Sequence, residues 1–404
     1  MLIALLRALR HYRWLKLLAA GLFLSSLGSG LTLVLTMGLL LEWQAPALTL
    51  VLAYTLSTLP GWFGSVIGEK LCKRLSPFQI LILAETIGLF SLGFLGWGVL
   101  HQQSTSLLLA QSVAALSGGM SFPALSQLLK YHLREEELPA ATALETLVFA
   151  ANVVVGIGVG VLIFGHLPPL MLLALDALSF ILAIALLAAA SKKPDKQQLK
   201  EEDQDNAVST ISWRKLSPLQ QRSMLMLPML ASVGTPAMAL MPALARSLPT
   251  ETATSMALPL LLARGLGQLC GPLLLPADNL KNYANNNKLL LCCLLIFLGC
   301  YWLLPFSPIA LLALGLIFIA HLASNVVYAL VTFGLLANFS RQHISSASAR
   351  AWRWQILTVG GISILAGGLA DYLGPILAME LMSGLSLAIG AVLLHLTRVG
   401  KNSA

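Results

Sequence analysis

Long apolar runs, separated by short polar turns, occupy most of the chain. A helix needs about 20 apolar residues to cross the hydrocarbon core of a bilayer. The runs that meet this requirement predict an all-α membrane protein with about twelve transmembrane helices in two six-helix bundles. Their expected bounds are roughly residues 15–41, 47–68, 78–100, 106–130, 139–164, 169–190, 219–246, 252–275, 289–306, 308–338, 348–370 and 375–397.

One long polar stretch interrupts this pattern. Residues 191–217 carry many Lys, Glu and Asp side chains, which is typical of a solvated linker. We therefore expect an N-terminal bundle over residues 1–190, a cytoplasmic linker over 191–217 and a C-terminal bundle over 218–404.

The composition agrees with a surface that faces lipid. Of the 404 residues, 57% are hydrophobic and 10% are charged, and the mean hydropathy is +0.82. A soluble domain has roughly 25% charged residues. The net charge of +8 does not predict a nucleic-acid partner, because the basic residues lie between apolar spans rather than on one soluble face.

The basic residues also predict an orientation. With a cytoplasmic N-terminus, nearly all Lys and Arg fall on one side; Arg246 is left on the other side and Arg264 inside a span. Basic loops are retained in the cytoplasm, so we expect a multi-pass protein of the cell inner membrane with both termini cytoplasmic. The basic, then long apolar N-terminal segment has no small-residue cleavage site and is interpreted as a membrane helix, not a removed signal peptide.

The sequence offers no pattern for enzymatic chemistry. It contains no HExxH, no nucleophile elbow and no phosphate-binding GxxxxGK[ST]. None of the five cysteines forms a CxxC pair, so neither a disulfide framework nor a metal site is expected. We predict a protein that is not an enzyme and uses no cofactor or metal.

Two stretches of the chain resemble each other weakly. Residues 134–165 and 341–374 both run from a charged turn, through small residues, to a glycine-rich helix that ends at a Gly-Pro or Pro-Pro break. Two related halves around a linker are typical of transporters whose substrate site lies near the bilayer midplane.

The loop at residues 65–74, Ser-Val-Ile-Gly-Glu-Lys-Leu-Cys-Lys-Arg, carries a family resemblance. It resembles the loop motif of the major facilitator superfamily: Gly, three residues, Asp, Arg, any residue, Gly, Arg, Arg. Ser and Cys replace both glycines here. The resemblance implies the major facilitator fold and a cytoplasmic gate, in which an acid caps the start of a helix from the other half, here expected near Arg350. The implied gate residues are Glu69, Lys70, Lys73, Arg74 and Arg350.

A narrower resemblance is to siderophore exporters of the enterobactin type and to macrolide-efflux proteins. It depends on Phe122-Pro123-Ala124, on residues 138–144 (Leu-Pro-Ala-Ala-Thr-Ala-Leu) and on residues 367–371 (Gly-Gly-Leu-Ala-Asp). Lysophospholipid transporters share part of this pattern. The antiporter motif of the fifth helix is degenerate, because its glycines are present but its Gly-Pro pair is absent.

Charged residues inside spans cost several kcal/mol unless they face a cavity or a partner. Arg264 lies mid-span and is expected to bind an anionic group of the substrate; an ion pair that fixes helix packing is the alternative. Glu145 lies about two turns into its span and is expected to carry the coupled proton; the alternative is an ion pair with Arg134 or Lys130 at the cytoplasmic edge.

Three further residues complete the expected substrate site. Arg353 lies at a similar depth and either faces Glu145 or ends the basic cytoplasmic belt. His321 and Asn325 are one turn apart and share a helix face; substrate contact, proton transfer and simple packing are all open to them. For Glu85 and Asp176 we expect hydrogen bonds between helices.

These features predict a monomeric secondary active transporter that works by alternating access. We expect proton-coupled export of a small amphipathic or anionic organic molecule, first a siderophore and second a drug-like compound. The alternatives are a siderophore importer of the same fold, a lysophospholipid flippase, or a membrane scaffold or sensor that transports nothing. The expected partners are the substrate, protons and the lipid bilayer.

Overall fold

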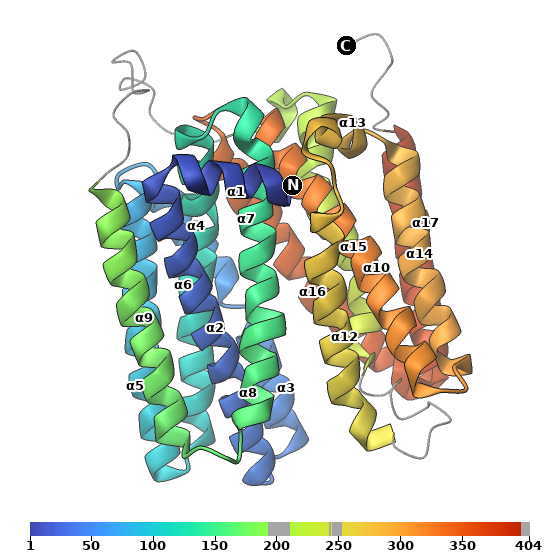
Figure 1. The fold of residues 1–404 in the computed structure, drawn as a ribbon. Coiled ribbons are helices and arrows are strands. Elements are labelled where there is room, and N and C mark those ends of the chain that lie inside the picture. Colours follow the sequence, from blue (N-terminus) through green and yellow to red (C-terminus); the bar gives the residue numbers. More distant parts are fainter. Residues whose placement is uncertain (193–210, 242–243, 245–252, 397–404) are drawn as a thin grey trace. The chain divides into compact units, whose positions relative to one another are not determined.

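A computed structural model describes residues 1–192, 211–241, 244 and 253–396 of the chain. Apart from one bridge between Phe164 and Leu167, every regular element in these ranges is a helix (Figure 1). Eight of the described helices are long and apolar enough to cross a membrane. The all-helical fold predicted from the sequence is therefore confirmed.

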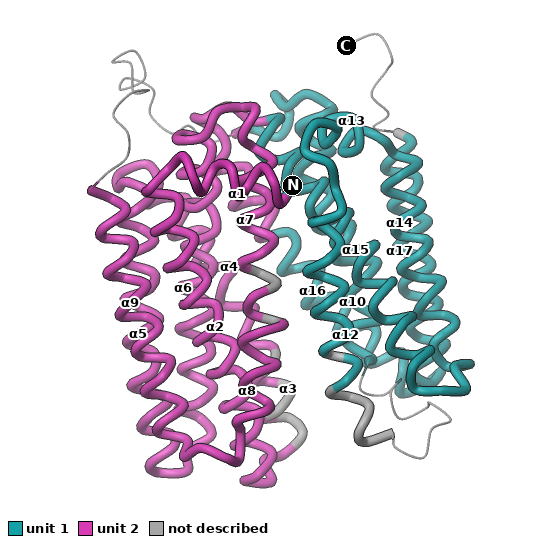
Figure 2. Tube along the Cα trace, in the orientation of Figure 1, with its two compact units in different colours: residues 1, 212–338, 354–404 teal, residues 2–211, 339–353 magenta. Residues whose placement is uncertain are grey.

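The helices fall into two compact units, shown in different colours in Figure 2. Unit 2 comprises residues 2–211 and 339–353, and unit 1 comprises Met1 and residues 212–338 and 354–404. The first half of the chain forms the following helices, all in unit 2: α1 (Leu2–His11), α2 (Arg13–Glu42), α3 (Ala47–Leu56), α4 (Gly61–Leu71), α5 (Pro77–His101), α6 (Ser104–His132), α7 (Leu138–Ala150), the π-helical turn η2 (Ala151–Ile157), α8 (Gly158–Ile163) and α9 (Pro169–Ser191). The helices of the second half are α10 (Pro218–Ala239), α12 (Ala253–Leu273), α13 (Leu280–Ala284), α14 (Asn287–Leu303), α15 (Ala310–Asn338), α16 (Ile344–Leu373) and α17 (Pro375–Leu396).

The units do not coincide with the two sequence halves. Residues 339–353 follow α15 in the chain but belong to unit 2, so α16 starts in unit 2 and continues in unit 1 after Arg353. Most of the expected linker, residues 193–210, lies outside the described residues, as do the ends of two expected spans at residues 242–243 and 245–252.

Two predicted spans are interrupted helices. The second divides into α3 and α4 around residues 57–60, where Pro60 lacks a backbone N–H to continue the first helix. The fifth consists of α7, the π-helical turn η2 and α8. Hydropathy identifies both spans but carries no signal for such breaks.

An additional helix precedes the first span. The sequence analysis assigned no helix before residue 15, but α1 covers Leu2–His11 and lies across one end of the helices of unit 2 (Figure 1). Ten residues are too short to cross a bilayer. Leu5 and Ala8 are buried whereas Leu2, Ile3 and Leu6 are exposed, so this helix packs along one side only.

One helix in each unit begins with the same sequence pattern, a serine followed by a proline and a glutamine. Ser76 before α5 and Ser217 before α10 are both followed by a proline at the first helical position and by a glutamine three residues on. Each serine accepts a hydrogen bond from the glutamine backbone N–H, and each glutamine side chain returns one to the serine backbone. These capping boxes satisfy N–H groups that a helix start otherwise leaves unpaired.

Hydrogen bonds between helices satisfy two of the buried acids of unit 2. Ser25 on α2 donates to Glu85 on α5 over 2.6 Å, and Thr32 on α2 donates to Asp176 on α9. Ser179 also donates to Asp176. The expectation of helix-to-helix hydrogen bonds at Glu85 and Asp176 is confirmed, and both acids hold α2 against its neighbours.

Candidate functional site

Residues 65–74, which resemble the family motif, contribute Glu69 to a buried ion pair within unit 2. The carboxylate of Glu69, near the end of α4, lies 2.7 Å from a guanidinium nitrogen of Arg353. Its other oxygen accepts a hydrogen bond from Ser346 Oγ over 2.5 Å. The two ion-pair side chains are only 11% and 13% exposed, so Glu69 joins α4 to two positions of α16. We call Glu69, Ser346 and Arg353 the latch.

A run of small residues lets the start of α16 pack closely inside unit 2. Residues 344–349, Ile-Ser-Ser-Ala-Ser-Ala, are all buried. The Ser65 hydroxyl donates to the backbone oxygen of Ala349 over 3.0 Å, so the residue that replaces a motif glycine makes a contact of its own. The rings of Phe122 and Trp352 stack with their centroids 4.6 Å apart.

The helix that Glu69 meets begins earlier than predicted. It was expected to start near Arg350, but α16 starts at Ile344, and Glu69 binds Ser346 in its first turn. There an acid also interacts favourably with the helix dipole. The other expected gate residues stand apart from the latch: Lys70, Lys73 and Arg74 are exposed and Arg350 is half-buried, and none of them pairs with an acid in the described ranges.

A second group of polar side chains lies within unit 1. Tyr301 on α14 and His321 on α15 are almost fully buried, and the Tyr301 hydroxyl lies 2.8 Å from His321 Nε2. Arg264 on α12 is close enough to interact electrostatically with both side chains. Three helices thus contribute one residue each to an Arg–Tyr–His cluster.

The cluster retains unused hydrogen-bonding groups. Arg264 Nε and His321 Nδ1 are buried without a hydrogen-bond partner. Gln268, one turn after Arg264 on α12, is 4% exposed and its Oε1 is also unpartnered. No carboxylate pairs with Arg264 among the residues that the structure describes. Buried polar groups are ordinarily satisfied, so these atoms indicate a place where a ligand or water completes the contacts.

Two glycines on α12 fix the spacing of this cluster. A Cβ at Gly267 would overlap the backbone oxygen of Phe318, and a Cβ at Gly271 would overlap that of Leu322. Both oxygens belong to α15, so α12 and α15 are in backbone contact next to His321. Small residues at a helix interface allow this approach, which brings Arg264 within reach of the other two side chains.

Asn325 joins the cluster only indirectly. It is 5% exposed, and its side-chain nitrogen donates to the backbone oxygen of His321, one turn earlier, over 3.4 Å. Arg264, His321 and Asn325, three of the expected substrate-binding residues, all lie in unit 1.

Glu145 is a buried acid of unit 2 without an ion pair. It is 7% exposed, and neither carboxylate oxygen has a hydrogen-bond partner, although the Ser126 hydroxyl on α6 lies near enough to influence it. Lys130, one of its alternative partners, instead lies 4.0 Å from Glu135. Among the described residues Glu145 pairs with neither Lys130 nor Arg134.

Arg353 takes part in the latch of unit 2. The sequence analysis left two positions open for it, facing Glu145 or ending the cytoplasmic belt, and the observed partner is Glu69. Sequence reasoning missed Tyr301, Gln268 and Ser346. Gln268 had a detectable signal, because it follows Arg264 by one helical turn within an apolar run; a lone Tyr or Ser in a span has none.

The described residues contain no group of three His, Cys, Asp or Glu side chains that could hold a metal ion.

The family follows from a comparison with family models. The model of the major facilitator superfamily matches residues 18–352, most of the chain. The chain belongs to this superfamily. It is therefore a membrane transporter of the major facilitator fold, a family of secondary transporters and not of enzymes.

Solved structures of major facilitator transporters share this fold. The human organic anion transporter MFSD10 (TETRAN) aligns with a TM-score of 0.72 at 14% identity, covering 94% of this chain and 98% of that one. A variant of the E. coli fucose:proton symporter FucP gives 0.67 at 15% identity, covering 95% and 98%. A bacterial homologue of the iron transporter ferroportin, in an outward-facing state, gives 0.70 at 13%, covering 95% and 98%.

A similar sequence comes from Pseudescherichia vulneris. The protein is described as "Uncharacterized 29.9 kDa protein in crtE 3'region" and is 50% identical over 71 residues. The match spans 18% of this chain and 26% of that protein.

Proposed function

We propose that this superfamily member exports a small anionic or amphipathic organic molecule, a siderophore first and a drug-like compound second, in exchange for protons. In this proposal Arg264, with His321, Tyr301 and Asn325, binds the anionic group of the substrate, and Glu145 carries the proton. The observation that carries the proposal is the guanidinium of Arg264, which lies in the mainly apolar sequence of α12 and has no carboxylate partner among the described residues.

The chemistry of the cluster in unit 1 favours an anion. A guanidinium presents several N–H groups in a planar fork that matches a carboxylate or a catecholate oxygen pair. His321 Nδ1 and Gln268 Oε1 are buried and unpartnered, and can contact further polar groups of a substrate. A cationic substrate would be repelled by Arg264, and no described acid lies in the cluster to offset that repulsion.

Glu145 has the properties that proton coupling requires. A carboxylate without a charged partner is costly in a low-dielectric setting, so the neutral form is favoured until a conformational change exposes it to water. Its burial in unit 2 without an ion pair among the described residues supports this role better than a structural one. One proton crossing a potential of 100 mV supplies about 2.3 kcal/mol, to which a pH difference adds.

The latch supports a conformational cycle. Glu69 holds the start of α16 in unit 2 through one ion pair and one hydrogen bond. Alternating access requires such contacts to form in one state and break in the other. We propose that the cytoplasmic gate is the latch, with Lys70, Lys73, Arg74 and Arg350 as its basic surroundings.

The substrates of the similar structures do not indicate which substrate this protein transports. Their titles name an organic anion, fucose with a proton, and iron. At 13–15% identity they share the fold, and one fold hosts many substrates.

The proposal is tested with everted membrane vesicles that contain the full-length protein. Energised vesicles are offered a catecholate siderophore, a macrolide, a lysophospholipid and a cationic dye, and uptake is compared for the wild type, Arg264→Ala and Lys281→Gln, an exposed control. We expect the siderophore or the macrolide to accumulate in the wild type and the control, and Arg264→Ala to lose most of this activity. Preference for lysophospholipid would favour the flippase, and an unchanged Arg264→Ala would refute the substrate site.

A further inference from the structure

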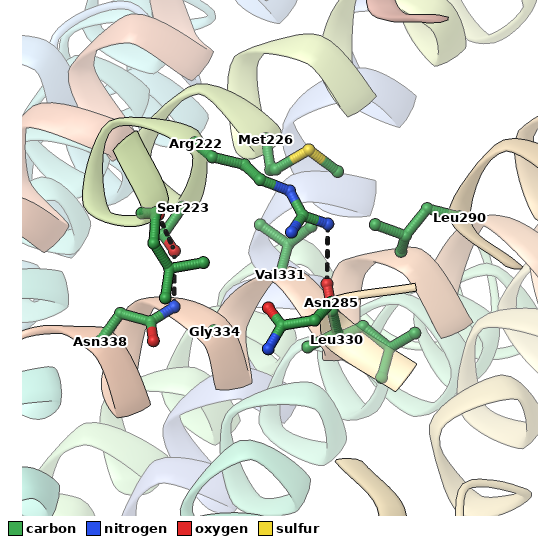
Figure 3. A pocket seen from close by; sticks show the side chains of 11 residues that line it. Arg222, Ser223, Met226, Asn285, Leu290, Leu330, Val331, Gly334 and Asn338 are labelled. Atoms are coloured by element: carbon green, nitrogen blue, oxygen red, sulfur yellow. Dashed lines mark hydrogen bonds between the residues drawn. The ribbon is translucent and has the colours of Figure 1, made fainter. Parts of the chain in front are cut away.

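A small pocket lies within unit 1, away from the Arg–Tyr–His cluster. It opens where α10 begins and α15 ends, and the turn between α13 and α14 forms its third wall (Figure 3). About 260 Å³ of space lies between the lining residues, part of it open to solvent. The enclosed part is far smaller than the pockets that hold drug-sized ligands, so the occupant is a small group held at the mouth.

The pocket contains a buried positive charge. Arg222 on α10 is only 2% exposed, and its guanidinium reaches across the pocket toward the Asn285 side (Figure 3). One nitrogen donates to the backbone oxygen of Ala284 over 2.9 Å, whereas Nε is buried and has no partner. No acid pairs with Arg222 in the described ranges. A buried charge without a counter-ion is strongly unfavourable.

Other side chains around the pocket are polar but neutral. Asn338 donates to the Ser223 hydroxyl over 2.9 Å, and that hydroxyl donates in turn to the backbone oxygen of Leu219. Asn285 is exposed and places an amide at the mouth. Lys281 and Lys288 are exposed on the same α13–α14 segment but do not line the pocket.

We propose that this pocket binds an oxyanion of the phosphate class, with Arg222 as the main ligand and Asn285 as a donor at the mouth. Nε and the adjacent nitrogen of a guanidinium form the edge that phosphate oxygens bind in pairs. Free phosphate and the headgroup of an anionic phospholipid share this chemistry, and basic pockets between transmembrane helices bind such headgroups. The bound anion supplies the counter-charge that Arg222 lacks within unit 1.

The experiment uses the purified full-length protein in detergent. Its thermal unfolding midpoint is measured against increasing inorganic phosphate at constant ionic strength, with chloride as the balancing anion. A second series adds phosphatidylglycerol, with phosphatidylcholine as the neutral control. A ligand that binds only the folded state raises the midpoint in a saturable way. We expect saturation with phosphate, with phosphatidylglycerol or with both, which identifies a soluble anion, a lipid headgroup or their shared chemistry.

Substitutions of single residues test whether the rise in the unfolding midpoint comes from anion binding in the pocket. Arg222→Gln is expected to weaken the apparent affinity at least about tenfold, equivalent to about 1.4 kcal/mol. Lys281→Gln, an exposed charge on the same segment, is expected to keep it within about twofold. Where Arg222→Gln does not fold, Arg222→Lys keeps the charge but loses the planar edge and serves the same test. Absence of a saturable shift in the wild type, or an equal shift in the Arg222 variant, would overturn the proposal.

Discussion

The guanidinium of Arg353 lies 2.7 Å from the carboxylate of Glu69, with both side chains largely shielded from water. This pair connects α4, from the first half of the sequence, to α16, from the second half, within unit 2. Removing one partner of a buried ion pair typically costs about 3–5 kcal/mol, because the remaining charge stays buried and uncompensated. Loss of either partner therefore destabilises the state in which the latch is closed.

A double-mutant cycle measures this contribution. We expect Glu69→Gln and Arg353→Gln each to lower the free energy of unfolding, and the double variant to lose less than the sum. A coupling energy of about 1–3 kcal/mol is predicted for residues in direct contact. Reversible unfolding in mixed micelles gives the four values; additive effects would show that the two side chains do not interact in solution.

The thiol of Cys72 reports on the same contact. Burial raises the pKa of the Cys72 thiol to about 12, and the charge of Glu69 acts in the same direction. Only the thiolate reacts with maleimides, so a raised pKa keeps Cys72 mostly unreactive at pH 8. Glu69→Gln removes the charge and loosens the surrounding contacts.

We therefore expect faster labelling of Cys72 in Glu69→Gln, by roughly tenfold for each unit by which the pKa falls. Maleimide labelling at pH 8 is followed in a variant in which the other four cysteines are replaced by Ala. Glu42→Gln, an exposed acid at the end of α2, is the matched control. Equal labelling rates in both variants would mean that the latch does not protect Cys72.

Tyr301→Phe tests the Arg–Tyr–His cluster. The substitution removes the hydroxyl that contacts His321 Nε2 and leaves that nitrogen buried without a partner, at a cost of about 1–3 kcal/mol. We expect a raised KM for the transported anion with little change in expression. Tyr372→Phe, 88% exposed on α16, is the control. Transport kinetics that are identical in the two variants would exclude Tyr301 from the substrate site.

Gly267→Val tests the contact of α12 with α15. The new side chain would collide with the backbone oxygen of Phe318 and push the two helices apart. Because Arg264 lies one turn earlier on α12, we expect transport to fall even where the protein still folds and reaches the membrane. Gly315→Val on α15 has open space around its Cβ and is expected to be tolerated. Transport per folded molecule is measured in both variants. Equal transport in Gly267→Val and Gly315→Val would contradict a role for the α12–α15 contact.

The sequence predicted the parts of this protein that depend on local patterns. Apolar length located the spans, and the cost of charge in lipid pointed to Arg264, which the structure places near His321. Tyr301 was missed because an isolated tyrosine in an apolar run carries no signal until its partner is known. The position of Arg353 and the membership of residues 339–353 in unit 2 depend on contacts between distant segments, which periodicity does not encode.

The central claim is that a proton taken up by Glu145 drives transport of an anion. Purified protein is reconstituted into liposomes, and uptake of the substrate identified in vesicles is measured with and without an imposed pH gradient. The same liposomes are used for counterflow, in which unlabelled substrate inside exchanges for labelled substrate outside without a gradient. Glu380→Gln, which removes a half-buried acid on α17, is the control.

The decisive measurement is the gradient-driven uptake of Glu145→Gln relative to its counterflow. The account predicts that this variant loses uptake driven by the pH gradient but keeps counterflow, whereas the wild type and Glu380→Gln keep both. Gradient-driven uptake by Glu145→Gln at the wild-type rate would contradict it.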